Sequence, residues 1–432
     1  MKAAFYTLGC KVNQYETQIM EQCLIAAGYE IVSSDQPADV YIVNSCTVTS
    51  ESDRKTRSVL RRLKSLNPDA IAVLSGCFPQ SFPERAAVFV DADIVTGVHG
   101  RGEIDLLIAQ ALKQGGRLVN IAAFGQDEHF EPMQAEGLDG HTRAFVKIED
   151  GCRSFCSYCI IPYSRGPVRS KGLSELKSEL GALAEQGYKE AVLVGINLSA
   201  YGSDLSLTLA DAIDTANSTD KLRRIRLGSL EPNIITEDFI RRIKRCDKLC
   251  PHFHLSLQSG CEATLQRMNR QYTPAHFERA AGMLREAYPG CGVTTDIIVG
   301  FPGETAPEFE QSLEFVSNIG FSQGHVFAYS KRTGTKAAEM PCQVDKAEKS
   351  RRSRLMTVAC ALSKQAFLNG LAGQTLPVLF EEGRDGSFTG FAPNYASVRV
   401  VSEINLRGKI MNVSITGADT LGCSGNLIEY VL

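Results

Sequence analysis

The chain has 432 residues, of which 44% are hydrophobic and 22% are charged, the balance of an ordinary soluble globular protein. This composition excludes wholesale disorder, collagen and a small disulfide scaffold, and the length predicts about three domains. The formal net charge is −3, so any contact with nucleic acid must come from local basic patches. We find neither the roughly 18 apolar residues of a membrane span nor a signal-peptide pattern, and therefore expect a cytoplasmic protein.

The first 140 residues alternate between short apolar runs and helical patterns. The expected strands are residues 3–8, 40–43 and 70–74. The expected helices are residues 13–27 and 50–66. This alternation predicts a parallel-sheet α/β domain over residues 1–140, which ends in a linker with one strand at 118–122.

The middle of the chain, residues 141–370, shows the same alternation over a longer stretch. Its expected strands are residues 144–148, 191–195, 224–227, 252–257, 292–299 and 325–329. Six strands separated by helices predict a partial (β/α)6 barrel, followed by one long helix at 346–368. The tail, residues 371–432, has short β-rich segments separated by Gly or Pro, which predicts a small antiparallel β-barrel of a type that often binds nucleic acid.

Fourteen cysteines are many for a compartment in which thiols stay reduced, and they favour metal or thiol chemistry over disulfides. Three of them, Cys152, Cys156 and Cys159, lie within eight residues directly after an expected strand. Three such thiolates can wrap one soft centre, which is zinc, copper(I) or an iron–sulfur cluster. Structural zinc takes four closed ligands, and no fourth Cys or His lies near in the sequence. Three ligands leave one metal position open for chemistry; a zinc site completed from a distance is the alternative.

A second trio, Cys10, Cys46 and Cys77, has one cysteine just past each of the first three expected strands. Because the carboxyl ends of parallel strands share one edge of a sheet, we expect these three thiols to converge. Gly9 and Gly76 precede two of them and allow the backbone to come close. Three separate core cysteines are the alternative explanation.

The C-x3-C-x2-C spacing, with Tyr158 before the last cysteine, resembles the radical S-adenosylmethionine (SAM) superfamily. In that superfamily three cysteines hold a 4Fe–4S cluster, SAM binds its fourth iron, and the reduced cluster cleaves SAM to a 5′-deoxyadenosyl radical. The chain as a whole resembles the methylthiotransferases. They carry an N-terminal domain with a second 4Fe–4S cluster, then a radical-SAM barrel, then an RNA-binding β-barrel called TRAM.

Residues 7–16, Thr-Leu-Gly-Cys-Lys-Val-Asn-Gln-Tyr-Glu, are similar to the branch that acts on N6-threonylcarbamoyladenosine in tRNA. That branch adds a methylthio group at carbon 2 of the adenine beside the anticodon, and the isopentenyladenosine branch tends to carry Gln-Met-Asn where this chain has Lys11-Val12-Asn13. The resemblance implies two 4Fe–4S clusters, SAM, a tRNA anticodon stem-loop, and an electron donor such as flavodoxin or ferredoxin. The alternatives are isopentenyladenosine tRNA or a ribosomal-protein aspartate as substrate, and an RNA-binding module with structural metal sites.

Candidate SAM contacts follow the expected barrel strands, where barrel enzymes place their sites. With Tyr158 of the cysteine loop, they are Gly195, Asn197, Arg226, Ser229, Gln258, Asp296 and Gly300. The Arg226 guanidinium matches the SAM carboxylate bidentately, and Gly300 would let the backbone approach the adenine. Turn chemistry at strand ends is the alternative explanation for these residues.

The eight cysteines outside the two trios are predicted to be structural.

The candidate RNA contacts fall into two groups. The first group recurs at helical spacing and comprises Arg54, Arg57, Arg61 and Lys64. The second mixes cations with an aromatic in the tail and comprises Arg384, Phe391 and Arg399. Both suit phosphate contact and base stacking, and a solvated helix face or a filled barrel core explains them equally well.

Overall fold

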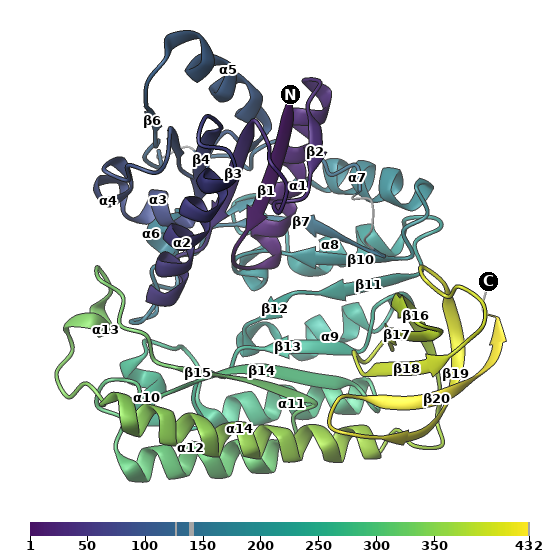
Figure 1. Cartoon of the computed structure of the whole chain (residues 1–432). Helices are drawn as coiled ribbons and strands as arrows, with labels where there is room; N and C mark the ends of the chain where they lie inside the picture. The colour runs from purple at the N-terminus through teal and green to yellow at the C-terminus, as the bar shows by residue number, and fades with distance from the viewer. Residues whose placement is uncertain (126–127, 138–141, 431–432) are drawn as a thin grey trace.

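A computed structural model describes residues 1–125, 128–137 and 142–430, and shows two α/β units and a small β-barrel (Figure 1). In Figure 1 the N-terminal sheet (purple and blue) lies above the central strands (teal and green), and the C-terminal strands (yellow) lie at one end of them. The predicted α/β fold class is confirmed, whereas the boundary predicted at residue 140 lies outside the described residues. Within the described ranges no helix is long and apolar enough to cross a membrane.

The N-terminal domain is a six-stranded parallel sheet in the order β2-β1-β3-β4-β5-β6. Its strands are β1 (Lys2–Thr7), β2 (Glu30–Val32), β3 (Val40–Ser45), β4 (Ile71–Gly76), β5 (Ile94–Thr96) and β6 (Leu118–Asn120). Helices α1 (Lys11–Ala26) and α5 (Ile104–Gln114) pack on one face, and α2 (Ser50–Leu66) packs on the other. Short helices α3 (Cys77–Ser81) and α4 (Pro83–Ala87) follow β4. Because both faces are covered, the central strands are buried along nearly their whole length.

The central unit contains the six predicted parallel strands. They are β7 (Arg143–Lys147), β10 (Glu190–Val194), β11 (Arg224–Leu227), β13 (His252–Leu255), β14 (Gly292–Val299) and β15 (Gln323–Ala328). They form the sheets β11-β10-β7 and β12-β13-β14-β15, in which β12 is Ser229–Leu230. An isolated parallel bridge joins Ile225 of β11 to Leu249, three residues before β13, and so brings the edges of the two sheets together.

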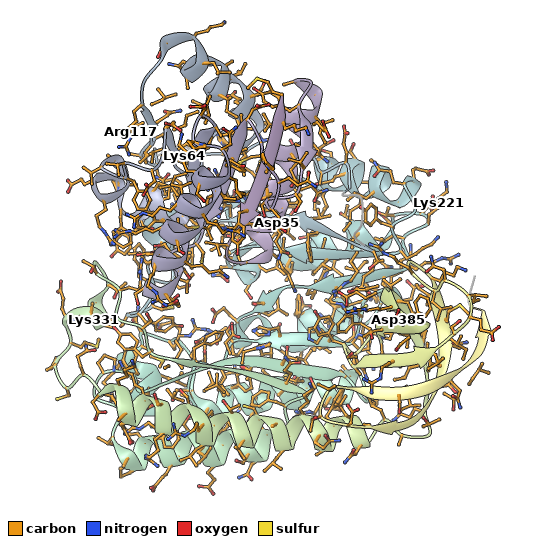
Figure 2. The ribbon with its side chains drawn as sticks, viewed as in Figure 1. Asp35, Lys64, Arg117, Lys221, Lys331 and Asp385 are labelled. Carbon is orange, nitrogen blue, oxygen red and sulfur yellow. The ribbon has the colours of Figure 1, made fainter. Side chains whose placement is uncertain are left out.

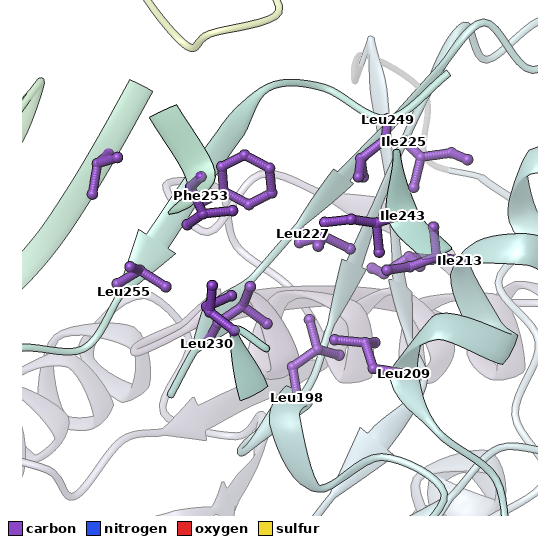
Figure 3. Close-up of a cluster of buried hydrophobic side chains, with 14 of the residues drawn as sticks. Leu198, Leu209, Ile213, Ile225, Leu227, Leu230, Ile243, Leu249, Phe253 and Leu255 are labelled. Atoms are coloured by element: carbon purple, nitrogen blue, oxygen red, sulfur yellow. The ribbon is translucent and has the colours of Figure 1, made fainter. Parts of the chain in front are cut away.

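Helices surround the central strands. They are α6 (Ile161–Arg165), α7 (Leu173–Glu185), α8 (Leu209–Asn217), α9 (Glu237–Ile243), α10 (Glu262–Arg267), α11 (Pro274–Ala287), α12 (Ala306–Ile319), α13 (Lys336–Glu339) and α14 (Lys346–Asn369). Figure 3 shows Ile225 and Leu227 of β11 beside Ile213 of α8 in the hydrophobic core. Successive strand residues point to opposite faces, so Arg224 and Arg226 point away from these helices.

The C-terminal barrel is closed in the order β16-β17-β18-β20-β19. Its strands are β16 (Thr375–Arg384), β17 (Ser387–Phe391), β18 (Ser397–Val401), β19 (Ile410–Ala418) and β20 (Cys423–Tyr430). Its pairs are antiparallel as predicted, except that β18 and β20 are parallel, with Val398 opposite Cys423. The difference arises because the chain skips from β18 to β19 and returns in β20 to close the barrel.

The loop after β17 covers the amino ends of the central strands. Arg226 donates hydrogen bonds to the carbonyl oxygen atoms of Pro393 at 2.9 Å and Ala392 at 3.4 Å. The imidazole of His252 stacks on the ring of Tyr395, with centroids 4.6 Å apart. The C-terminal barrel is therefore docked at the opposite end of the central strands from their carboxyl ends.

A buried ion network fixes the N-terminal domain on the central barrel. Glu16 of α1 is completely buried and pairs with Arg165 of α6 and with Lys147 of β7. Burial alone would raise the pKa of Glu16, but Arg165, Lys147 and Arg101 lower it below its ordinary value. Since these cations are buried, they need carboxylate partners for compensation; Glu16 is a partner of all three, and Asp150 is a second partner of Lys147 and Arg165.

We predict that Glu16→Gln lowers the free energy of unfolding by about 3–5 kcal/mol, because Arg101 then loses its anion and Lys147 and Arg165 must share Asp150. Chemical denaturation of the purified protein measures this change. The matched control is Glu185→Gln, since Glu185 is 67% exposed and pairs with Lys221 on the surface. The control should shift stability by less than about 1 kcal/mol, and equal effects in the two variants would contradict a structural role for the network.

Candidate active site

The first cysteine trio converges at the carboxyl edge of the N-terminal sheet. Cys46 and Cys77 directly follow strands β3 and β4, and Cys10 follows the adjacent strand β1 by three residues. The Oδ1 atom of Asn13 lies 3.9 Å from Sγ of Cys10 and 3.9 Å from Sγ of Cys77. A Cβ atom on Gly9 would lie 2.9 Å from Cβ of Cys46, so a glycine is required where the two loops meet. The strand order thus brings the three thiols together, as the sequence predicts.

The electrostatics of this trio are set by burial and by one arginine. Burial raises the pKa of Cys77 to about 12, while the nearby Arg165 guanidinium opposes the rise. Arg165 donates a hydrogen bond from Nε to Sγ of Cys77 at 3.2 Å. Cys10 is exposed and Cys46 half-buried, so the trio is open on one side.

The second trio lies in the loop after β7 and the short strand β8 (Glu149–Asp150). Arg270 donates a hydrogen bond to Sγ of Cys156 at 3.2 Å, and Nδ2 of Asn197 lies 3.8 Å from Sγ of Cys152. Burial and the neighbouring Cys156 together raise the pKa of Cys159 to about 12. Each cysteine of this loop therefore has either a nitrogen donor or another thiol beside it.

Both trios suit an iron–sulfur cluster. Each supplies three thiols, and N–H donors face the sulfur atoms, which is the kind of surrounding that tunes such clusters. In the ranges that the structure describes, no three Cys, His, Asp or Glu side chains are placed to hold one metal ion. A 4Fe–4S cubane binds each thiolate to a different iron, so its ligands do not have to meet at one point.

One short helix links the two trios. Helix α6 begins two residues after Cys159 and ends at Arg165, whose guanidinium contacts Cys77 of the other trio. The same guanidinium donates to Oδ1 of Asn13 at 2.7 Å, and α6 packs against α3, the helix that begins with Cys77. The two cysteine trios therefore border one another across the junction between the domains.

A cavity of about 250 Å³ adjoins the second trio and brings together three of the predicted SAM contacts. Tyr158, Gln258 and Asp296 line it beside Cys159. The backbone of Gln258 adopts φ 65° and bridges to Ile297 of β14, which holds this side chain at the cavity. Its opposite wall belongs to the N-terminal domain and comprises Val48 and Thr49.

Other predicted SAM contacts have structural partners that the sequence did not reveal. Arg226 is 1% exposed and pairs with Glu190 at 2.6 Å, so its guanidinium has no free edge for a SAM carboxylate. A Cβ atom on Gly300 would lie 2.4 Å from Cγ of Lys349, so this glycine makes room for helix α14. Ser229 is exposed at the start of β12. The Arg226 assignment is therefore corrected, because Glu190 and two carbonyl groups already bind this guanidinium. Gly300 and Ser229 stay predictions as SAM contacts.

Gly195 and Asn197 act together around a buried carboxyl group. Glu149 is completely buried, and burial raises its pKa well above the ordinary value. Its Oε2 accepts a hydrogen bond from the backbone N–H of Asn197 at 2.7 Å. A Cβ atom on Gly195 would lie 2.6 Å from the same oxygen, so only glycine fits there. This pair thus supports the start of the cysteine loop.

Of the predicted RNA contacts, two have partners within the protein and five are exposed. Phe391 stacks on Tyr395 in the loop that covers the central strands, with centroids 4.8 Å apart, so it serves the domain junction. Lys64 pairs with Asp93 at 2.8 Å and is 26% exposed. The other five are exposed on the two predicted surfaces and comprise Arg54, Arg57, Arg61, Arg384 and Arg399.

Three residues at the cysteines were missed from the sequence. Asn13 follows Cys10 by one helical turn, a spacing that gave a usable signal. Arg165 and Arg270 gave none, because their partners lie 88 and 114 residues away in the chain. Only the fold brings these two guanidinium groups to the thiols.

Comparison with known proteins identifies the family. Residues 2–97 match the family described as "Uncharacterized protein family UPF0004", and residues 146–316 match the radical SAM superfamily. The threonylcarbamoyladenosine tRNA methylthiotransferase MtaB of Bacillus subtilis is 38% identical over 99% of this chain and 96% of its own length. The chain belongs to the radical-SAM methylthiotransferase family. As a member it is an enzyme that uses SAM and iron–sulfur clusters, which confirms the cofactors predicted from the sequence.

Further relatives of this methylthiotransferase come from two branches. The Aquifex aeolicus protein of the same name is 34% identical over 89% of this chain and 94% of its own length. The tRNA-2-methylthio-N(6)-dimethylallyladenosine synthase of Thermoanaerobacter pseudethanolicus is 33% identical over 98% of this chain and 92% of its own length. In fold, the chain resembles the radical SAM methyltransferase TsrM of Kitasatospora setae, with a TM-score of 0.56 at 15% identity over 78% of this chain and 74% of that one.

We predict that iron and sulfide uptake by this methylthiotransferase becomes tighter as the pH rises from about 7 to about 9. Burial raises the pKa of Cys77 and of Cys159 to about 12, so both thiols must lose a proton when iron binds. Anaerobic titration followed by absorbance measures the uptake. The control Cys246→Ala removes a buried thiol outside both trios and should leave uptake unchanged. Uptake that does not depend on pH would contradict the account of these thiols.

Proposed function

We propose that this methylthiotransferase adds a methylthio group to carbon 2 of N6-threonylcarbamoyladenosine beside the anticodon of tRNA. The observation that carries the proposal is the pair of cysteine trios that border one another through Arg165. A relative named for this substrate is 38% identical over nearly the whole chain, whereas a relative of the dimethylallyladenosine branch is 33% identical. The proposal therefore combines a site with two clusters and the substrate of the more similar branch.

The residues of the site divide into three roles. Cys152, Cys156 and Cys159 hold one 4Fe–4S cluster, and Cys10, Cys46 and Cys77 hold the other. Reduced clusters with SAM supply the hydrogen abstraction and the sulfur and methyl transfer that ordinary acid–base groups cannot perform at an aromatic C–H bond. Tyr158, Gln258 and Asp296 bind SAM in the cavity beside Cys159. The N–H groups of Arg270, Asn197 and Arg165 face the sulfur atoms and favour their anionic state.

We propose one role for each of the three domains. We assign residues 1–140 to the auxiliary cluster, 141–370 to SAM and the first cluster, and 371–432 to RNA binding. Arg384 and Arg399 of the C-terminal barrel are exposed and pair with Asp385 at 3.6 Å and with Asp419 at 3.0 Å, so a phosphate group would have to compete with these carboxylates. A cytoplasmic tRNA and a reductant such as flavodoxin or ferredoxin complete the proposed reaction.

A second candidate keeps the chemistry and changes the substrate. Dimethylallyladenosine in tRNA is favoured by the relatives of that branch, which are 32–33% identical over 98% of this chain. A ribosomal-protein aspartate is the third candidate that the sequence raised, and none of the named relatives acts on it by name. An RNA-binding module with zinc sites disagrees with membership of an enzyme family.

The test is anaerobic reconstitution with a defined tRNA, followed by mass spectrometry of its nucleosides. We expect about eight iron per chain and conversion of N6-threonylcarbamoyladenosine to its 2-methylthio derivative. Conversion of dimethylallyladenosine alone would move the enzyme to the other branch. Zinc in place of iron, with no conversion, would contradict the proposed chemistry.

Single cysteine variants separate the two sites in the same assay. Cys152→Ala should abolish SAM cleavage, because that trio then lacks one of its three ligands. Cys46→Ala should still cleave SAM but form no methylthio product, and each variant should hold about four iron instead of eight. Normal methylthiolation by Cys46→Ala would show that the second trio has no part in the reaction.

A further inference from the structure

A basic cleft of about 280 Å³ lies where α2 of the N-terminal domain faces the loop after β15. Five basic side chains line it, namely Arg54, Arg57, Arg85, Lys331 and Arg332. In Figure 2 Lys331 lies beside the lower end of α2, whereas Lys64 lies near the upper end of the same helix. Two separate domains thus contribute cations to one hollow.

The carboxylates at this cleft are already occupied by part of the basic set. Asp53 accepts hydrogen bonds from the buried Arg332 at 2.9 Å and from Thr47 at 3.1 Å, and Arg85 lies 3.7 Å away. Glu51 accepts a hydrogen bond from Arg54 at 2.6 Å. These contacts hold the walls of the cleft in place and neutralise its carboxylates.

Arg57 and Lys331 are the two basic residues of the cleft whose charge is not balanced by a carboxylate in the described part of the chain. Both side chains are exposed, and within the described part of the chain neither has a carboxylate at ion-pair distance. The Arg57 guanidinium lies over the ring of Phe89, 5.3 Å from its centroid, which orients it without neutralising it. The cleft therefore carries an excess of positive charge that an anion would balance.

The remainder of α2 does not share this property. Farther along the helix Arg61 pairs with Asp91 at 2.9 Å, and Lys64 pairs with Asp93 at 2.8 Å. The basic face predicted over the whole helix is thus neutralised at its far end. Its free charge is concentrated at the end that faces the barrel.

This end of α2 directly adjoins the proposed SAM cavity. Thr49 and Ser330 line the cavity, and the next residues in the chain, Ser50 and Lys331, line the cleft. The backbone N–H of Ser50 donates to Oγ of Ser330 at 3.3 Å, so one hydrogen bond separates the two spaces. An anion in the cleft would lie next to whatever group enters the cavity.

We propose that the cleft binds a phosphodiester group of the substrate RNA, adjacent to the nucleotide whose base is modified. This inference rests on the proposed function, because it requires RNA as the substrate. Guanidinium and ammonium groups both bind phosphate, the first bidentately and the second as a point charge. Since the cations come from both domains, the bound phosphate also ties the N-terminal domain to the barrel. The site thus favours a polynucleotide over a free nucleoside.

The test compares the double variant Arg57→Gln/Lys331→Gln with the wild-type holoenzyme in binding an anticodon stem-loop RNA. We expect the dissociation constant to rise about 10- to 100-fold and the salt slope to fall by about 1. Lys221→Gln is the control, because Lys221 is exposed on the opposite edge of the molecule in Figure 2 and pairs with Glu185. Circular dichroism of each variant checks that the fold is retained, and the single variants replace any double variant that fails this check.

A neutral methylphosphonate next to the modified nucleotide identifies the phosphate. It should weaken binding to the wild type and leave the double variant unaffected, because both changes remove the same interaction. Equal affinity and salt slope in the wild type and the double variant would overturn the proposal that the cleft binds a phosphodiester group, and would leave the proposed function standing. Failure of the wild type to bind the RNA would overturn both.

Discussion

The buried guanidinium of Arg165 is the contact on which the rest of the site depends. It stands six residues after Cys159, donates to Sγ of Cys77, and pairs with the fully buried Glu16. This residue is therefore joined to the loop of Cys159 through helix α6, and to Cys77 of the first trio through a hydrogen bond. Because a buried cation cannot lose its partners without a large penalty, this contact holds the two trios in one fixed frame. Chemistry that would use two clusters at one substrate base depends on such a frame.

The two ends of the central strands carry different domains. The loop after β17 covers the amino ends of the central strands, where Arg226 and His252 bind it. The cysteines, the proposed SAM cavity and the basic cleft all lie at the junction with the N-terminal domain. The C-terminal barrel is thus docked on the central strands through buried contacts, and Arg384 and Arg399, which pair with Asp385 and Asp419, lie on its surface.

Local patterns predicted most of the fold and the six cysteines, because strand periodicity and ligand spacing are encoded over short stretches. The sequence missed the short strands β2 and β5, which have three residues each. It also assigned Arg226 to SAM, since an arginine at a strand end does not reveal that Glu190 and the carbonyl groups of residues 392 and 393 already bind it. Arg165 and Arg270 went unnoticed for the converse reason: their thiol partners are far away in the chain. Contacts between distant segments decide which of several similar side chains is free to act.

The most direct test of a shared two-cluster site is pulsed electron paramagnetic resonance on the reduced, fully reconstituted protein. Two reduced clusters that border one another across Arg165 should show a clear dipolar coupling. That coupling should disappear in Cys46→Ala, which retains only the other cluster. Two clusters without measurable coupling, in protein shown to hold about eight iron, would place the trios too far apart and contradict the account.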